Sequence, residues 1–434
     1  MSKKTLKAIA ILAFLAFLNG NAFAANTATS TTSGTGNVST VTQSGDGQTA
    51  DVNQDGDDND SNVEQSSLNN TATVDQQNDR NDSDVLQTGD GNTATVNQGT
   101  FVIGGVENDN SSTVLQSGNG NGATVSQGAE NVSTIEQSGD DNTASVDQEG
   151  VLLGAPAGNT SDILQSGSLN SATVIQDDDN LSTILQSGDG NSATVDQTPF
   201  FGSDNNVSDV SQTGNDNPAS VKQSGNDNLS TVGQLGDLNS ADVTQSGTGN
   251  ISDVAQFGDG NSATVDQSGT GNLSTVSQDT DNTASVDQSG TDNVSTVNQT
   301  GPFGSFGNSA TVSQSGANNT STVNQDGGVT PNGISNDNVA IVDQSGDWNE
   351  ATVSQDDFNT AEVLQTGVGT SADPNVVNIT QWNDSDEAYA EQNGGEGNNI
   401  LIEQEACCTG GGVFNSATAI QSGSFNTTTI IQSP

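Results

Sequence analysis

Polar and apolar residues alternate along this chain within a short phrase that recurs every eleven residues, Asn-x-(Ser or Ala)-x-(Val or Ile)-x-Gln. The phrase, or a degenerate copy of it, occurs about 33 times between Asn37 and Gln432. Its fixed residues stand at positions one, three, five and seven, which is the spacing of a strand with one buried face. Gly and Asp between the phrases are typical of turns. The pattern predicts strands joined by short turns, and no helix.

The third position of the phrase alternates between Ser and Ala, as in Ser39 and Ser61 against Ala50 and Ala72. We call the two kinds Ser phrases and Ala phrases. The true repeat is therefore a pair of phrases, about 22 residues long. One pair cannot bury its small apolar face alone, but stacked pairs bury a continuous core and let parallel strands hydrogen-bond along the stack. We predict an all-β fold, a two-sided parallel β-solenoid with an amyloid-like interior.

Stacking places identical inward residues above one another, so Val forms apolar columns and the Asn and Gln amides form ladders that satisfy one another. We expect these residues to act structurally, as the positions that hold successive turns together. The candidate ladder and column residues are Asn37, Val41, Gln43, Gln54, Gln65, Gln76, Gln87, Asn92, Val96, Gln98, Gln256, Asn261 and Gln267.

The two outer faces differ in polarity. Ser phrases often have an aliphatic residue at position two, whereas Ala phrases have Thr or Ser there and often Asp at position six. Exposed apolar stripes usually mark association, so the Ser-phrase face is a candidate lateral contact surface. The alternative is that these side chains only cover the sheet near its corners. The candidate residues are Val38, Leu181, Leu229, Ile251 and Leu273.

Composition alone would suggest disorder, because the 434 residues are only 29% hydrophobic and 3% aromatic; the periodicity favours the solenoid. The chain has 5 Lys plus Arg against 55 Asp plus Glu, a formal net charge of −50. Such a chain will not bind nucleic acid or anionic lipid by charge. Because stacked acids repel one another, we expect salt, divalent cations or lowered pH to favour self-association. The alternative is that the acidity only keeps the chain soluble.

The chain divides into four segments by sequence. Residues 1–24, with three Lys before an apolar run and Ala22-Phe23-Ala24 at the end, have the features of a secretory signal peptide. Residues 25–36 form a short lead, 37–374 the regular repeats, and 375–434 degenerate repeats that could serve as a cap. The first apolar run is too short to span a membrane comfortably, and no later segment approaches a span.

Nothing in the sequence supports catalysis, a cofactor or a bound metal. It contains no His, and the carboxylates recur in turns or on outer faces without a unique cluster. Cys407 and Cys408 are adjacent. A vicinal disulfide, an intermolecular bridge and free thiols are all open alternatives for this pair.

Seven insertions lengthen the turns, and the first three all follow Ala phrases, which places them on one edge. They could be binding loops or merely tolerated surface excursions. The insertions are residues 100–109, 149–158, 198–205, 300–307, 326–337, 366–374 and 405–414.

The twelve-residue pattern Gln-x-Gly-x-x-Asn-x-Ala-x-Val-x-Gln, found from Gln87 to Gln98 and from Gln256 to Gln267, resembles the curlin repeat of bacterial curli proteins. The resemblance covers nearly all of the chain after residue 24. It implies a secreted subunit of functional amyloid that stacks end to end into adhesive biofilm-matrix fibres as a homopolymer. It also implies passage through the periplasm, export by an outer-membrane pore, and a nucleator or companion subunit.

One departure concerns the role within such a fibre. The major curli subunit has Ser six residues before the first Gln of each repeat, whereas this chain has Asn there, as at Asn37 and Asn59. The more uniform phrase is closer to the nucleator, so both roles stay open.

Two other classes of solenoid remain as alternatives. A calcium-binding β-roll adhesin has a nine-residue Gly-rich repeat with a fixed Asp, whereas here the period is eleven and Gln is fixed. An ice-binding or surface-adhesion solenoid needs a regular Thr array. Position four supplies Thr40, Thr73 and Thr95, but Asp51 and Asp84 interrupt the column.

Overall fold

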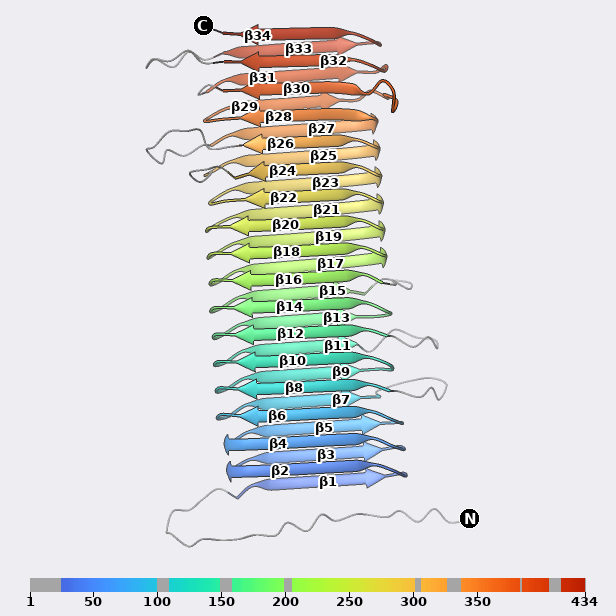
Figure 1. Cartoon of the computed structure of the whole chain (residues 1–434), viewed down its shortest axis with the longest axis vertical. Coiled ribbons are helices and arrows are strands. Elements are labelled where there is room, and N and C mark those ends of the chain that lie inside the picture. Colours follow the sequence, from blue (N-terminus) through green and yellow to red (C-terminus); the bar gives the residue numbers. More distant parts are fainter. Residues whose placement is uncertain are drawn as a thin grey trace. The chain divides into compact units, whose positions relative to one another are not determined.

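A computed structural model describes residues 25–99, 109–148, 158–198, 205–300, 306–325, 337–382, 385–405 and 415–433. The chain divides into two units, Met1–Ser211 and Gln212–Pro434. In each unit the described elements are all strands, stacked in two sheets (Figure 1). Sheet A holds the Ala phrases, and sheet B holds the Ser phrases as far as residue 325.

In the first unit, sheet A contains β1 (Thr27–Ser33), β3 (Thr49–Asp55), β5 (Thr71–Gln77), β7 (Thr93–Gln98), β9 (Gly122–Gln127), β11 (Thr143–Gln148), β13 (Ser171–Gln176) and β15 (Ser192–Gln197). Sheet B contains β2 (Val38–Asp46), β4 (Asp60–Leu68), β6 (Asp82–Thr88), β8 (Ser111–Ser117), β10 (Val132–Ser138), β12 (Thr160–Ser166) and β14 (Leu181–Ser187). The next Ser phrase forms β16 (Val207–Thr213), which contains the division between the units.

In the second unit, sheet A contains β17 (Pro218–Asn226), β19 (Ser240–Thr248), β21 (Ser262–Thr270), β23 (Thr283–Thr291), β25 (Ser309–Ala317), β27 (Val339–Asp347), β29 (Thr360–Gln365), β31 (Glu387–Asn393) and β33 (Ser416–Ser422). Sheet B contains β18 (Leu229–Leu235), β20 (Ile251–Phe257), β22 (Leu273–Gln278), β24 (Val294–Gln299), β26 (Thr320–Gln325), β28 (Asn349–Gln355), β30 (Asn375–Gln381), β32 (Asn399–Gln404) and β34 (Thr427–Gln432).

Within each unit, a strand pairs in parallel with the strand two places further along the chain. Between β19 and β21, for example, Ala241 pairs with Ala263 and Gln245 with Gln267, so like residues stand in register. Parallel in-register pairing with small inward residues matches the prediction of a two-sided parallel β-solenoid, which is confirmed.

The core consists of the inward positions of both sheets. Val or Ile at position five and Ala at position three are almost fully buried throughout the interior strands, as are Gln at position seven and Asn at position one. Positions two, four and six point outward, as the alternating burial of β15 and β20 shows. The interior is therefore half apolar and half amide, and its stability depends on every buried amide having hydrogen-bond partners.

The solenoid begins earlier than the repeats. Strand β1 lies inside the segment 25–36, which the sequence suggested was only a lead, and it pairs in parallel with β3 from Thr27↔Thr49 to Ser33↔Asp55. Its residues Ala28 and Ser30 take the places of Ala and Val in the phrase, while Thr32 takes the place of Gln. Of the fixed residues, Ala28 and Asn26 remain at positions three and one, and Asn26 Oδ1 accepts the backbone N–H of Gln48 at 3.0 Å.

The degenerate segment 375–434 continues the same stack. Strands β30, β32 and β34 pair in parallel, and so do β31 and β33. In sheet B, Ser occupies position three from β2 to β26, Ala351 follows in β28, and then Val377 and Ile400, which are fully buried. The interior is thus more apolar near this end. Whether the segment acts as a cap stays a prediction.

Candidate functional site: amide ladders, chain ends and outer faces

The buried Gln side chains form continuous hydrogen-bonded ladders in each sheet. The Nε2 of each Gln donates to the Oε1 of the Gln one turn further along, for example Gln76 to Gln98 at 2.9 Å and Gln245 to Gln267 at 2.8 Å. The same Nε2 also donates across the interior to a backbone carbonyl of the other sheet, as Gln76 does to Asp60 at 2.8 Å. Each Gln therefore joins successive turns and also joins the two sheets.

The Gln residues singled out from the sequence all lie in these ladders. Links that include them are Gln43 to Gln65 (2.9 Å), Gln65 to Gln87 (2.7 Å), Gln54 to Gln76 (2.9 Å), Gln98 to Gln127 (3.0 Å) and Gln256 to Gln278 (3.0 Å). Val96 is fully buried in sheet A, whereas Val41 and Gln43, in the second strand of the chain, are only half-buried.

The Asn side chains form much of the expected amide-to-amide ladder, as from Asn81 Nδ2 to Asn59 Oδ1 at 3.1 Å, and they add backbone links to it. The Oδ1 of each Asn accepts the backbone N–H of the Asn one turn later, as between Asn59 N and Asn37 Oδ1 at 2.9 Å and between Asn282 N and Asn261 Oδ1 at 3.1 Å. The Nδ2 donates to turn carbonyls, as from Asn92 to Gly118 at 2.9 Å. Asn at position one thus joins successive turns and also fixes the start of each strand to the turn beside it.

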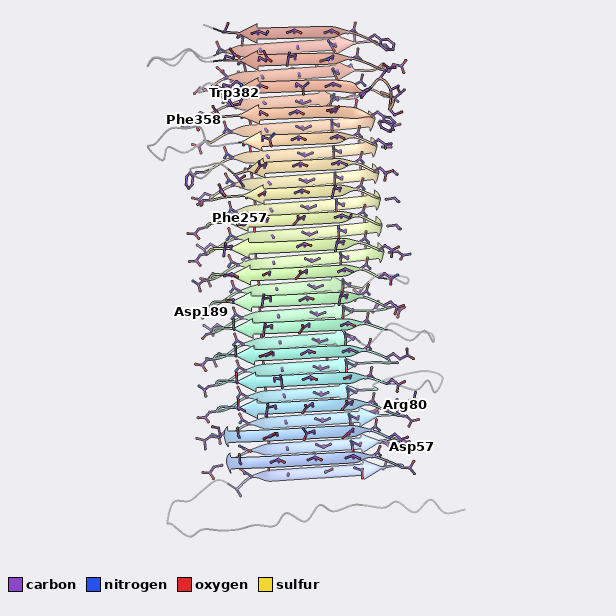
Figure 2. The ribbon with its side chains drawn as sticks, in the orientation of Figure 1. Asp57, Arg80, Asp189, Phe257, Phe358 and Trp382 are labelled. Carbon is purple, nitrogen blue, oxygen red and sulfur yellow. The ribbon has the colours of Figure 1, made fainter. Side chains whose placement is uncertain are left out.

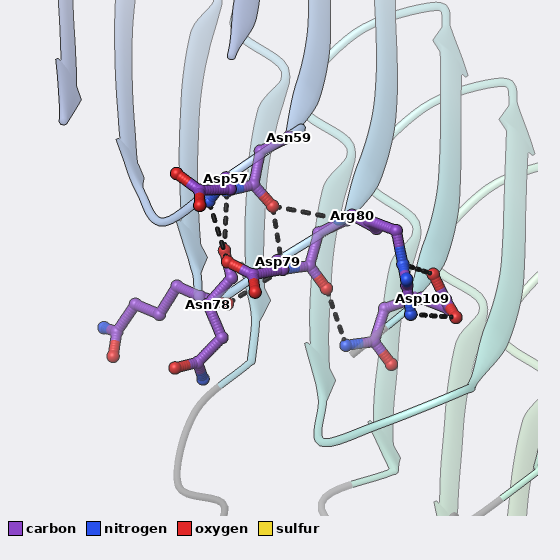
Figure 3. A network of polar contacts seen from close by, with 9 residues as sticks. Asp57, Asn59, Asn78, Asp79, Arg80 and Asp109 are labelled. Carbon is purple, nitrogen blue, oxygen red and sulfur yellow. Dashed lines mark hydrogen bonds and ion pairs between the residues drawn. The ribbon is translucent and has the colours of Figure 1, made fainter. Parts of the chain in front are cut away.

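Asp residues in the turns accept hydrogen bonds from the turn before them in the stack. The backbone N–H of Thr35 donates to Asp57 Oδ1 at 2.7 Å, and that of Asp57 donates to Asp79 Oδ1 at 2.8 Å (Figure 3). Hydrogen bonds from the Thr35 side chain and backbone lower the pKa of Asp57. The recurrence of Asp at about 22-residue spacing was the sequence signal for this second ladder.

At the same edge of the first unit, Arg80 pairs with Asp109 in bidentate geometry, with Nε to Oδ1 at 2.6 Å and Nη2 to Oδ2 at 2.9 Å (Figure 3). Arg80 and Asp57 lie at one edge of this unit and Asp189 at the opposite edge (Figure 2). Both side chains of the pair are more than a third exposed, so the pair contributes little to stability.

A column of Ser hydroxyls is buried in sheet B of each unit without a hydrogen-bond partner among the described residues. At the first turn, by contrast, Ser30 Oγ donates to Ser39 Oγ at 2.9 Å. Sequence reasoning treated Ser and Ala as two small residues and missed this difference between the two interiors. The unpartnered hydroxyls belong to Ser61, Ser83, Ser112, Ser133, Ser161, Ser182 and Ser208 in the first unit, and to Ser230, Ser252, Ser274, Ser295 and Ser321 in the second.

The first and last turns carry ladder groups that have no partner within the described chain. In the first unit, Gln43 Oε1 in β2 accepts no hydrogen bond although it is buried. In the second unit, Gln432 in β34 accepts from Gln404 Nε2 at 2.8 Å, and its own Nε2 has one acceptor, the Ser416 carbonyl at 3.0 Å. Interior Gln side chains donate twice or more. One end therefore offers an acceptor and the other a donor.

The outer face of sheet B carries the apolar residues picked out from the sequence. Their exposed fractions are 52% for Val38 in β2, 41% for Leu181 in β14, 38% for Leu229 in β18 and 40% for Ile251 in β20. Leu273 in β22 is half-buried. All five point outward, as the period of two required.

The outer face of sheet A is acidic. Its outward Asp147 and Asp196 lie near Asp177, a buried residue just after β13 in the first unit. The pKa of Asp177 is raised to about 6, chiefly because burial penalises its charge and further because Asp178, Asp196 and Asp147 lie nearby. In the second unit, burial and then the neighbouring Asp287 and Asp242 raise the pKa of Asp266.

Several sequence expectations fall outside the described residues. These are the signal peptide at 1–24, the Cys407–Cys408 pair and most of the insertions. Strands β7, β11 and β15, which precede the first three insertions, all belong to sheet A of the first unit.

Two observations on other chemistry apply only to the part of the chain that the structure describes. It holds no group of three or more His, Cys, Asp or Glu side chains placed to bind a metal ion. It also has no helix long and apolar enough to cross a membrane.

Comparison with known families agrees with the geometry. The family described as curlin associated repeat matches residues 69–99, 127–150, 178–214, 204–236, 214–247, 236–269, 247–279 and 280–302. No curated protein matches the chain. A parallel β-solenoid with in-register Gln ladders defines a structural repeat protein. The matched segments consist of curlin-associated repeats, which confirms the resemblance to the curlin-repeat family.

Proposed function

We propose that this protein is a structural subunit of a curli-type fibre, polymerising end to end so that β1 and β2 of one copy continue the sheets that end at β33 and β34 of another. Its export through the periplasm to the cell surface, its role in biofilm matrix and adhesion, and its dependence on a nucleator or companion subunit belong to the same proposal. The observation that carries it is the match between the two ends.

In sheet B the match is complete at the inward positions. Placing β2 of a second copy on β34 in the register of the repeat sets Val41 on Ile430 and Gln43 on Gln432. The Nε2 of Gln432 then donates to the unpartnered Gln43 Oε1, as at every interior step of the ladder. Asn426 Oδ1, which accepts no hydrogen bond among the described residues, receives the backbone N–H of Asn37.

In sheet A the match is partial. β1 would set Ala28 on Ala417 in β33, but Thr32 would stand where the next ladder Gln should be. The junction is thus weaker than an interior step by one amide link. We infer that the C-terminal turn is an open growing end and not the cap that its degenerate sequence suggested, because it presents an unpaired strand edge with the ladder residues in place.

Two neighbouring isoleucines in β34 test this proposal. Ile430 points inward and would be covered by Val41 of the next copy, whereas Ile431 points outward and is 58% exposed. Ile430→Lys places a charge in the junction and is expected to stop fibre growth. Ile431→Lys changes the net charge equally and should leave growth within about twofold of the wild type, since surface changes are small in effect. Growth is measured by amyloid-dye fluorescence, with fibre diffraction to verify strand spacing along the axis.

The Ile430→Lys chain keeps an unaltered N-terminal end, so it can add to a wild-type fibre and then block the next addition. Substoichiometric amounts should shorten wild-type fibres, and circular dichroism shows whether each variant is folded. Equal growth of the two variants, or folded wild-type chain that never polymerises, would overturn the proposal.

A further inference from the structure

The second unit carries an outer face unlike the rest of this acidic chain. It is made by the outward positions of β18, β20, β22, β24 and β26 in sheet B, and Asp253 is its only charged residue. Outward positions of sheet A in the same unit include Asp242, Asp266 and Asp287. In a chain with a formal net charge of −50, this face is where two copies can approach without repulsion between rows of carboxylates.

The face is also ordered in shape. Position two forms a column of aliphatic side chains, Leu229, Ile251, Leu273 and Val294, held in register by parallel pairing. Position six of the first three strands forms a column of small residues, Gly233, Ala255 and Ser277. Position four between them is Thr on every strand except for Asp253. Phe257 extends the apolar surface at the end of β20 (Figure 2).

We propose that this face binds the same face of a second copy of the chain, about a twofold axis parallel to the solenoid axis of the unit. That rotation reverses the strand direction across the interface, so position two lies opposite position six. The aliphatic column of each copy then packs on the small-residue column of the other, and the contact is self-complementary as a twofold interface must be. The alternative twofold, parallel to the strands, would set large residues on large and small on small.

The size of the face suits a weak contact that polymerisation strengthens. Five strands about 4.8 Å apart and about 23 Å long present about 500 Å² on each copy, or about 1,000 Å² in total. That is near the lower limit for a specific interface. Where the solenoids are joined end to end, as in the proposed function, the same contact recurs along both partners and avidity adds to it. The inference rests on the proposed function only for this bundling, not for the pairing of two free chains.

The central test compares two pairs of substitutions with equal charge. Ile251→Asp with Leu273→Asp alters two adjacent position-two residues of sheet B, and Ser262→Asp with Thr283→Asp alters two adjacent position-two residues of sheet A. Sedimentation velocity on freshly prepared full chain measures pairing. The sheet B pair should lower the association constant at least about tenfold, because the loss of even one buried aliphatic side chain weakens binding by about that factor. The sheet A pair should lower it less than about threefold, through charge alone.

Two single substitutions test the arrangement. Ala255→Leu makes the surface more apolar but fills the space for the partner's aliphatic column, so association should weaken by about tenfold. Asp253 lies at position four near the twofold axis and faces its own counterpart, so Asp253→Asn should strengthen association severalfold. Stronger association of Ala255→Leu would overturn the arrangement, because general stickiness or the other twofold would then explain the pairing.

Dye-monitored growth separates this inference from the proposed function. All these sites lie in β20 to β23, and none is in the strands that would form the junction, β1, β2, β33 and β34. Elongation should therefore be unchanged in every variant while sideways pairing varies. Loss of elongation in the wild type would count against the fibre proposal alone. Equal pairing by the sheet A and sheet B variants would count against this interface alone.

Discussion

Gln76 and Gln77 are adjacent and identical in type, yet they have different surroundings. Gln76 is fully buried, accepts from Gln54 at 2.9 Å and donates to Gln98, Asp60 and Asn81. Gln77 is exposed, with an Nε2 contact to Asp75 Oδ2 at 3.3 Å. The difference arises because successive residues of a strand point to opposite faces.

We expect Gln76→Leu to destabilise the protein strongly and Gln77→Leu to have almost no effect. Removing the Gln76 amide leaves buried polar groups of its neighbours unsatisfied, at about 1–3 kcal/mol each, so the loss should reach about 2–4 kcal/mol. Urea unfolding followed by circular dichroism measures both. A similar midpoint for the two variants would mean that the ladder does not hold the turns together.

The sequence predicted which residues enter the ladders, because period-two spacing fixes the inward positions. It also predicted that amides link successive turns, but not the backbone partners of each amide. Gln and Asn have the same amide, but the shorter Asn also accepts the backbone N–H of the next Asn, as Asn37 does from Asn59. The longer Gln also reaches a backbone carbonyl of the opposite sheet, as Gln54 does. The length of the side chain decides which partners each amide reaches, and composition does not show this.

At the scale of the strands and turns, two glycines of one turn are required for different reasons. Gly247 in β19 has φ +103°, and a Cβ there would lie 2.0 Å from the carbonyl oxygen of Gly269 in the next turn. Gly249, two residues later, has φ +67° and open space around its missing Cβ. The stack itself excludes a side chain at Gly247, whereas only the left-handed backbone constrains Gly249.

Gly247→Ala should therefore destabilise the second unit by about 2 kcal/mol or more, because neither backbone can move without breaking parallel pairing. Gly249→Asn should cost less than about 1 kcal/mol, because Asn tolerates positive φ. Other turns already have Asp or Asn in that conformation, as at Asp227 and Asn318. Thermal melting of both variants checks this, and an equal loss would show that backbone conformation alone decides.

The strands and their order could be predicted from the repeat, but β1 could not. Its sequence, Thr-Ala-Thr-Ser-Thr-Thr-Ser, lacks Val and Gln, and its signs were Asn26 and Ala28 at positions one and three and the alternation of small residues. It is ordered because β3 offers a paired edge, and a contact of that kind is not visible in a local pattern. The insertions likewise were found by the break in period, which says nothing of their conformation.

For the molecule as a whole, the carboxylates govern the response to pH. Burial first and neighbouring acids second raise the pKa of Asp82, Asp177 and Asp266, with that of Asp177 reaching about 6. A carboxyl whose pKa is higher in the folded state binds a proton there first, so the free energy of unfolding rises as pH falls through the folded pKa towards the unfolded value. Asp57, with its lowered pKa, opposes this only below the ordinary range of a carboxyl, near 3.8.

We therefore expect the protein to be more stable at pH 5 than at pH 7, in contrast to a protein whose acids are held mainly by ion pairs. Asp177→Asn should raise the urea midpoint at pH 7 and reduce the gain between pH 7 and pH 5, because it removes the carboxyl with the largest shift. Asp162→Asn removes an exposed carboxylate from sheet B of the same unit and controls for net charge. If both variants gained as much stability between pH 7 and pH 5 as the wild type, burial of Asp177 would not be the source of that gain. A midpoint that fell from pH 7 to pH 5 would show that acids stabilised in their charged form, as in the turn ladder, dominate instead.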